Sequence, residues 1–166
     1  MNIKLVKGFG QGSTKLSAFD AALQAAGVSN YNLIVLSSVI PPKAIIERIE
    51  KYDTPVNEWG HKLYVIKAEE RSDIKGEAIA AGLGYYQFED DMRGIFVEHE
   101  AVGIDESAVR EKVVADIVAS LRDLCAFRKL PFDDTKVDME ISSTVVDDIP
   151  TCVLTLAVYE AEGWKS

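Results

Sequence analysis

Residues 16–42 have the sequence LSAFDAALQAAGVSNYNLIVLSSVIPP. Within this stretch, residues 16–26 carry apolar side chains at helical spacing, and they are followed by Gly27, a residue type that commonly ends helices. Residues 32–36 form a nearly continuous apolar run, which is typical of a strand. The two closing prolines cannot donate ladder hydrogen bonds, so the strand must stop or lie at an edge there. The stretch therefore predicts a helix, then a strand that ends at a Ser-Ser pair.

Outward from this stretch, the chain shows more strand patterns than helix patterns. Residues 106–128 have the apolar stripe of a long amphipathic helix, with Asp105 as its N-cap. Residues 43–51 favour a short helix, while the pattern at residues 77–86 fits a helix or a strand equally. A loop is expected at 52–60, and strands at 2–7, 62–68, 94–101, 136–146 and 152–159. Strands and helices do not alternate regularly, which favours an α+β fold in a single domain spanning residues 1–166.

Composition narrows the class of protein. Of 166 residues, 48% are hydrophobic and 27% are charged, which is typical of a folded domain and not of a disordered chain. A formal net charge of -9 opposes binding to phosphate backbones, so we expect no nucleic-acid partner. No apolar run approaches the ~20 residues of a membrane span, and the N-terminus lacks a signal peptide's apolar stretch. We therefore expect no membrane association, and two distant cysteines, Cys125 and Cys152, favour a reducing cytoplasmic location.

Two further features of the sequence are weak indicators of chemistry. Residues 8–12 have the spacing GxGxG between a predicted strand and a predicted helix, whereas dinucleotide sites need GxGxxG and a later acidic residue. We interpret these glycines as a flexible turn and keep a nucleotide site as the alternative. The only histidines are His61 and His99, and neither forms a helical i,i+4 pair with a second ligand type. We therefore expect no metal ion.

Taken together, the motifs of residues 16–42 resemble the pyruvoyl-dependent arginine decarboxylase family. That family's pattern is approximately AFD-x-AL-x-x-AG-x-x-N-x-NL-x-x-x-SS-x-x-PP, and this stretch matches it almost throughout. Residues 72–79 (SDIKGEAI) and 94–98 (GIFVE) are similar to later family segments. The resemblance spans most of the chain, and it implies a layered sandwich of mainly antiparallel sheets flanked by helices.

The resemblance implies that the chain makes its own cofactor by cutting the bond between Ser37 and Ser38. The Ser38 hydroxyl would add to the Ser37 carbonyl carbon, converting the amide into an ester. Elimination across the Cα–Cβ bond of Ser38 would then release the Ser37 carboxylate, and hydrolysis of the resulting dehydroalanine would release ammonia. The products would be a β chain of residues 1–37 and an α chain of residues 38–166 that begins with a covalent pyruvoyl group, without pyridoxal phosphate or metal.

The resemblance also assigns roles in decarboxylation. An amino acid would form a Schiff base with the pyruvoyl group and lose CO2. Glu98 matches the family's proton donor, although Glu100 faces the same side of the predicted strand and remains an alternative. Asp20 matches a carboxylate that binds the guanidinium with two hydrogen bonds. Leu16 matches a residue lining that pocket, and Asn32 matches an asparagine that orients either the scissile carbonyl or the substrate carboxylate.

One segment departs from the family pattern. Between residues 42 and 67 the family often carries a run rich in proline and glycine, whereas this chain has a charged stretch. The resemblance implies arginine as the small cationic substrate, and this departure keeps lysine and ornithine as alternatives. An uncleaved binding module of the same fold is a further alternative. The family forms trimers with active sites between neighbours, which implies a homo-oligomer here, either a trimer or a dimer of trimers.

Overall fold

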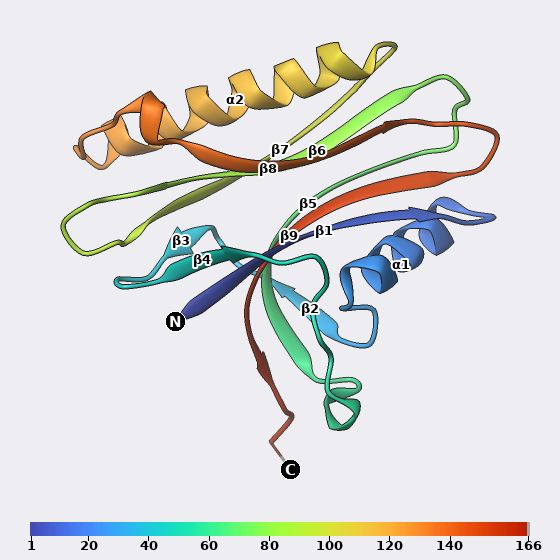
Figure 1. Ribbon diagram of the computed structural model, residues 1–166, viewed down its shortest axis with the longest axis horizontal. Helices are drawn as coiled ribbons and strands as arrows, with labels where there is room; N and C mark the ends of the chain where they lie inside the picture. Colours follow the sequence, from blue (N-terminus) through green and yellow to red (C-terminus); the bar gives the residue numbers. More distant parts are fainter. Residues whose placement is uncertain (166) are drawn as a thin grey trace.

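The computed structural model describes residues 1–165 and folds them into two β-sheets that pack face to face (Figure 1). Sheet A contains, in spatial order, β2 (Asn32–Val35), β5 (Lys62–Ser72), β9 (Thr151–Glu162), β1 (Asn2–Gln11) and β4 (Ile45–Arg48). Sheet B contains β3 (Val39–Ile40), β7 (Gly94–Gly103), β6 (Ala78–Gln87) and β8 (Asp138–Val145). The helices are α1 (Lys15–Ala26) and α2 (Glu106–Phe127), with short 3-10 turns at Val56–Glu58 and Asp134–Lys136.

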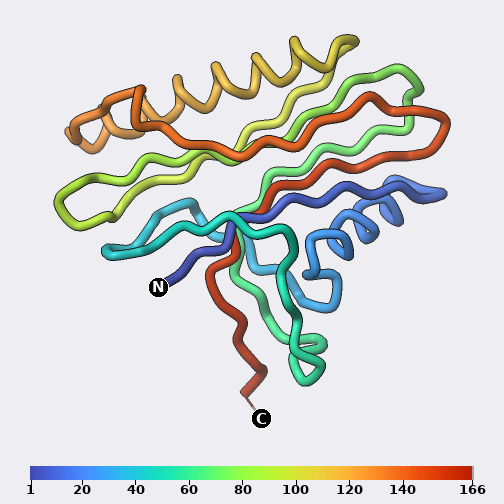
Figure 2. The backbone as a smooth tube through the Cα atoms, in the orientation of Figure 1, coloured from blue at the N-terminus to red at the C-terminus, as the bar shows by residue number. Residues whose placement is uncertain are grey.

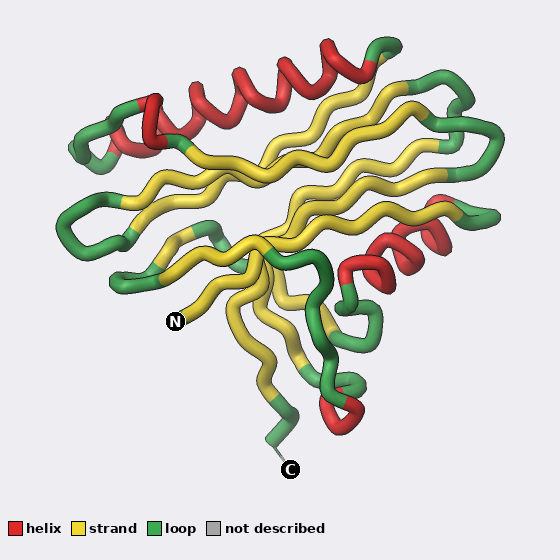
Figure 3. Tube along the Cα trace, in the orientation of Figure 1, coloured by secondary structure: helices red, strands yellow, loops and turns green. Residues whose placement is uncertain are grey.

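The two helices lie on the outer faces of the sandwich (Figure 3). α1 packs on sheet A against β1 and β9, and α2 packs on sheet B against β6 and β7. Most strand pairs are antiparallel, and the exceptions among the described residues are β1 with β4 and β2 with β5. This architecture confirms the predicted α+β sandwich of mainly antiparallel sheets flanked by helices.

The main core lies between the sheets. Strands alternate their side chains, so Leu5 of β1, Ile66 of β5 and Phe96 of β7 point inward and are almost fully buried. The buried hydroxyl of Thr155 donates to the Ala81 carbonyl at 3.1 Å, which links the two sheets without leaving a polar group unpaired.

β1 extends to Gln11 and includes Gly8 and Gly10, so the prediction of a flexible turn at residues 8–12 was wrong for all but Gly12. A Cβ atom at Gly8 would lie 2.2 Å from the carbonyl oxygen of Ala22, and one at Gly10 would lie 2.2 Å from the amide nitrogen of the same residue. The missing side chains thus let α1 approach β1 closely. They serve packing between a strand and a helix and form no cradle for a nucleotide phosphate.

Two other segments clarify what the sequence left open or misassigned. Residues 43–51 were expected to favour a short helix, but Ile45–Arg48 form β4, which pairs in parallel with the start of β1. The consecutive β-branched residues Ile45 and Ile46 fit a strand better than a helix. Residues 78–87 form β6, where Gly84 makes room for Ile117 of α2.

The ends of both helices agree closely with the predictions. Thr14 caps α1 by accepting a hydrogen bond from the backbone of Ser17, and Gly27 ends it with a left-handed φ of 87°. Asp105 caps α2 through the backbone of Ala108 at 2.8 Å. Neither these helices nor the short turns within residues 1–165 combine the length and the apolar character needed to cross a bilayer.

The Ser-Ser pair lies where the chain passes from one sheet to the other. β2 is an edge strand of sheet A and β3 is an edge strand of sheet B, and only residues 36–38 connect them (Figure 2). This connection holds the serines at the side of the sandwich, between an edge strand of each sheet.

Candidate active site

The backbone of Ser38 adopts a left-handed conformation, with φ at 70°. This conformation costs a residue other than glycine roughly 1–2 kcal/mol, so it persists only where neighbouring contacts enforce it. Such contacts are present on both sides. The Leu36 N–H donates to the Val65 carbonyl in sheet A at 2.8 Å, and the Phe96 N–H donates to the Ser38 carbonyl in sheet B at 2.9 Å. The Ser37–Ser38 bond is thus clamped between two sheets in a strained geometry.

The side chain of Ser38 contacts a carboxylate. Its hydroxyl donates to Oε2 of Glu98 at 2.9 Å. The pairing of β3 with β7 explains this contact, because the register places Val39 opposite Ile95 and brings the preceding residue alongside the next part of β7. Two residues separated by 60 positions in sequence are therefore joined by strand register.

A cavity of about 540 Å³ opens beside the serine pair. Its walls come from the segment of β7 around Glu98 and from the C-terminal half of α2. Within it, the His99 imidazole shares a hydrogen bond of 2.8 Å with the Ser120 hydroxyl. The lining residues are Ser37, Ser38, Ile95, Phe96, Val97, Glu98, His99, Ser120, Asp123, Leu124, Phe127 and Arg128. Apolar walls with a few converging polar groups are typical of small-molecule sites.

Glu100, the alternative proton donor, occupies a different environment. Its Oε1 accepts a hydrogen bond of 3.3 Å from the Glu69 N–H in sheet A. The pKa of Glu100 is raised, mainly because protein atoms displace water around it, with additional repulsion from the carboxylates of Glu70 and Glu98. Of the two candidates, Glu98 is the one that hydrogen-bonds to the Ser38 hydroxyl.

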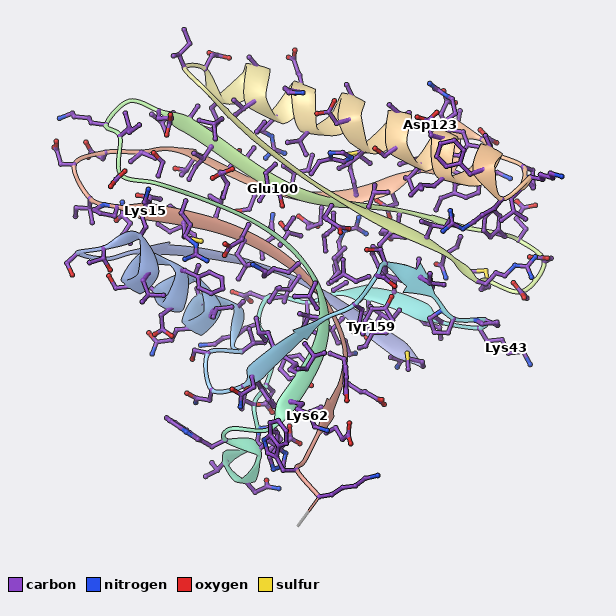
Figure 4. All side chains as sticks on the ribbon, turned by 180° about the vertical axis from the view of Figure 1, so that it is seen from behind. Lys15, Lys43, Lys62, Glu100, Asp123 and Tyr159 are labelled. Atoms are coloured by element: carbon purple, nitrogen blue, oxygen red, sulfur yellow. The ribbon has the colours of Figure 1, made fainter. Side chains whose placement is uncertain are left out.

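Three predicted substrate-binding residues do not reach the cavity within one chain. Leu16 and Asp20 lie on α1, and both are exposed, Leu16 by 69%. Figure 4 labels Lys15 at the start of α1 and Asp123 on α2, which lie on opposite sides of the sandwich. Asn32 begins β2, and its side-chain amide donates to the Gly60 carbonyl at 2.7 Å. The structure therefore joins Ser37, Ser38 and Glu98 and leaves the other three residues elsewhere on the surface.

Tyr159 is a contact of the site that sequence analysis missed. Tyr159 lies on β9 and is labelled in Figure 4. Its hydroxyl donates to the carbonyl of Val39, the residue after the serine pair, at 3.0 Å. Burial raises the pKa of this phenol, so it stays a neutral donor over the physiological range. The local sequence offered no indication beyond a tyrosine at the end of a predicted strand. His99 and Ser120 also went unassigned, because only the packing of α2 on β7 brings them together.

Comparison with known proteins gives consistent results over most of the chain. A family model described as pyruvoyl-dependent arginine decarboxylase matches residues 2–162. A Thermococcus kodakarensis protein of that name is 33% identical over 149 residues, covering 89% of this chain and 87% of the relative. A Picrophilus torridus protein of the same name is 30% identical, covering 84% and 78% respectively. A third protein of that name, from Methanococcus vannielii, is 39% identical over 113 residues. The match covers 66% of this chain and 66% of the relative, which is just under two thirds of the relative's length.

Proposed function

Because the chain belongs to the pyruvoyl-dependent arginine decarboxylase family, we propose that it is a carboxy-lyase that cuts itself at Ser37–Ser38 and converts L-arginine to agmatine and CO2. One observation carries this proposal more than any other. The Ser38 hydroxyl is hydrogen-bonded to Glu98 at 2.9 Å while its own backbone is held in a strained conformation.

The strained backbone supports self-cleavage of this bond. Leu36 and Ser38 are fixed by hydrogen bonds to different sheets, so the segment that contains the scissile bond is held at both ends. Attack of the Ser38 hydroxyl on the Ser37 carbonyl carbon replaces the amide by an ester, and later elimination leaves chains 1–37 and 38–166. Full release of a strain of roughly 1–2 kcal/mol in the transition state corresponds to about 5- to 30-fold in rate.

The same residues support decarboxylation after cleavage. A pyruvoyl group at position 38 supplies a carbonyl that binds the substrate nitrogen and accepts electrons when CO2 leaves. Glu98 is the carboxylate that hydrogen-bonds to the side chain at that position, so it is placed to return a proton to the substrate's α-carbon. The adjacent cavity, at about 540 Å³, falls within the range of sites that hold small molecules.

The far end of the substrate requires residues that one chain does not bring to the cavity. We propose that Asp20, Leu16 and Asn32 belong to a site shared between neighbouring copies, in a trimer or a dimer of trimers. The exposure of Asp20 and Leu16 on α1 fits this role, because both remain available to a neighbour. Asp20 would bind the guanidinium, Leu16 its aliphatic stem, and Asn32 the scissile carbonyl or the substrate carboxylate.

The charge and cysteine chemistry of the chain fit the same proposal. A net charge of -9 favours a cationic amino acid but does not select arginine over lysine or ornithine. Cys125 and Cys152 are both free and buried, which fits a cytoplasmic location.

Intact mass spectrometry of the wild type beside Ser38→Ala tests self-cleavage. The wild type should give two fragments that meet between positions 37 and 38, with one water gained and one ammonia lost in total. Ser38→Ala should stay one chain, because it lacks the attacking hydroxyl. Ser37→Ala is the matched control and should still be cut, since its carbonyl is unchanged. A wild type that remains one chain would instead favour an uncleaved binding module.

A subunit-mixing experiment tests the shared site. Asp20→Asn and Glu98→Gln should each abolish most CO2 release from arginine when expressed alone. In mixed trimers, about a quarter of the sites would combine an intact Asp20 from one copy with an intact Glu98 from another. Activity should therefore reappear on co-expression, whereas a site contained within one chain predicts no recovery. Parallel assays with lysine and ornithine identify the preferred substrate.

A further inference from the structure

The outer face of α2 carries a shallow groove that the candidate active site does not use. The inner stripe of the helix, which includes Val113 and Ile117, is buried against sheet B, while the opposite side faces away from the sandwich (Figure 1). A groove of about 550 Å³ runs along this outer side. Its lining residues are Ser107, Arg110, Glu111, Val114, Ala115, Val118, Ala119 and Arg122.

Charge and apolar character are arranged symmetrically along the centre of this face. Glu111 and Arg122 are eleven residues apart, which is about three helical turns or ~16 Å, so both point in nearly the same direction. Between them lie small apolar residues. Reversing the direction of the helix exchanges Glu111 with Arg122, Ala115 with Val118, and Val114 with Ala119.

We propose that this face of α2 docks antiparallel on α2 of a second copy of the chain. A two-fold axis passing midway between Glu111 and Arg122 would place each of these residues opposite its counterpart of unlike charge in the other copy. Two symmetry-related ion pairs would then flank a centre built from Ala115 and Val118. The small side chains allow the helices to approach closely, and the face is complementary to itself, which favours a second copy as the partner.

The charged residues have only weak partners within their own chain, and these include a cation–π contact of the Arg122 guanidinium with the Phe132 ring at 5.8 Å. The Ser107 hydroxyl donates to Glu111 at 3.2 Å, and the Arg122 guanidinium lies 3.8 Å from Asp134 in a pair whose two side chains are more than half exposed. Exposed pairs of this kind contribute little, so exchanging them for contacts across the interface costs little. Lys112 pairs with Asp116 at 2.7 Å on the flank of the helix, about a quarter turn or more from the central line.

This contact does not depend on the proposed decarboxylase. One helix pair forms a small interface, so isolated copies would associate weakly. In a trimer, three such contacts would act together and join two trimers with greater avidity. Whether the unit is a monomer or a trimer, docking through α2 doubles its mass.

Charge reversal tests the proposal. Sedimentation of the intact protein over a roughly hundredfold concentration range should show a doubled mass for the wild type at the upper end. Glu111→Arg and Arg122→Glu should each halve that mass, because like charges would face one another. The double variant should restore it. Lys112→Glu makes the same charge change as Arg122→Glu on the flank, and it should leave the doubled mass unchanged.

Two results would overturn the proposal. One is a wild type whose mass equals that of both single variants at every concentration. The other is a double variant that fails to regain the doubled mass while its circular dichroism matches the wild type. A denaturing gel of the same samples reports self-cleavage separately, so a failure of the proposed function is distinguishable from a failure of α2 docking.

Discussion

Replacing Ser38 with glycine should give a more stable chain than replacing it with alanine. At a φ of 70°, alanine bears a steric cost of roughly 1–2 kcal/mol that glycine avoids. Glycine loses about 0.5–1 kcal/mol more in backbone entropy on folding. The difference between these values favours Ser38→Gly by about 0.7 kcal/mol. At a position with negative φ, the alanine variant is the more stable one, so the sign of the stability difference shows whether position 38 is strained.

Urea unfolding at a fixed protein concentration measures this difference directly. Neither variant has a hydroxyl at position 38, so neither can cut itself and both unfold as intact chains. With an m value of about 2 kcal/mol per M, the expected difference moves the midpoint by about 0.35 M. The m values of the two variants should agree, since the surface exposed on unfolding is the same.

The adjacent residue provides the control. Ser37 is not among the residues with positive φ, so in a Ser38→Ala background its alanine variant should be more stable than its glycine variant by about 0.4–1 kcal/mol. If Ser38→Gly proves no more stable than Ser38→Ala, position 38 carries no strain in solution. The reasoning that ties this conformation to activation of the scissile bond would then fail.

Three further variants test other contacts of the structure. Tyr159→Phe removes the hydrogen bond to the Val39 carbonyl, which contributes about 0.5–1.5 kcal/mol. Self-cleavage, followed by the appearance of the two chains on a denaturing gel, should slow by up to roughly tenfold. An unchanged rate would exclude a role of Tyr159 in positioning the scissile bond. Glu98→Gln keeps an oxygen that accepts the neighbouring serine hydroxyl but cannot supply a proton, so cleavage should continue while CO2 release falls on the order of 100- to 10,000-fold. Partial burial disfavours ionisation of Asp138, but hydrogen bonds from Arg48 and Tyr85 outweigh it and lower its pKa. This stabilisation is present above the unfolded pKa of about 4 and is lost as pH falls through the lower folded value, so Arg48→Met should reduce stability at neutral pH and flatten its decline in acid, as measured by unfolding at a series of pH values.

Local sequence patterns were sufficient for the elements whose ends carry distinct chemistry. The capping residues Asp105 and Gly27 and the apolar stripe of residues 106–128 predicted both long helices almost to the residue. The pattern failed where packing decides the outcome. Residues 78–87 are rich in alanine and glycine because α2 packs closely against them. Position 8 requires glycine because α1 packs closely against β1 there. No short-range signal distinguishes such a strand from a helix or a turn.

The candidate site, too, could be predicted from the sequence only in part. The Ser37–Ser38 pair was identified by resemblance, and its strain could not be read from sequence because the cause lies in hydrogen bonds to residues far along the chain. The contact between Ser38 and Glu98 depends on the register of β3 against β7. Tyr159 reaches the site from the last strand. These contacts depend on how strands far apart in the sequence pair with one another, and local sequence patterns do not encode that pairing.

The place of β1 in sheet A determines what a cut at Ser37–Ser38 would leave behind. Residues 1–37 contribute an interior strand, bordered by β9 on one side and β4 on the other, together with α1 and β2. The two polypeptides would remain held together as a natural case of fragment complementation. The shorter one could leave only by breaking three ladders, those of β1 with β9, β1 with β4 and β2 with β5. Heat denaturation of the nicked protein should consequently separate the two polypeptides, with a melting temperature that rises as the protein is concentrated.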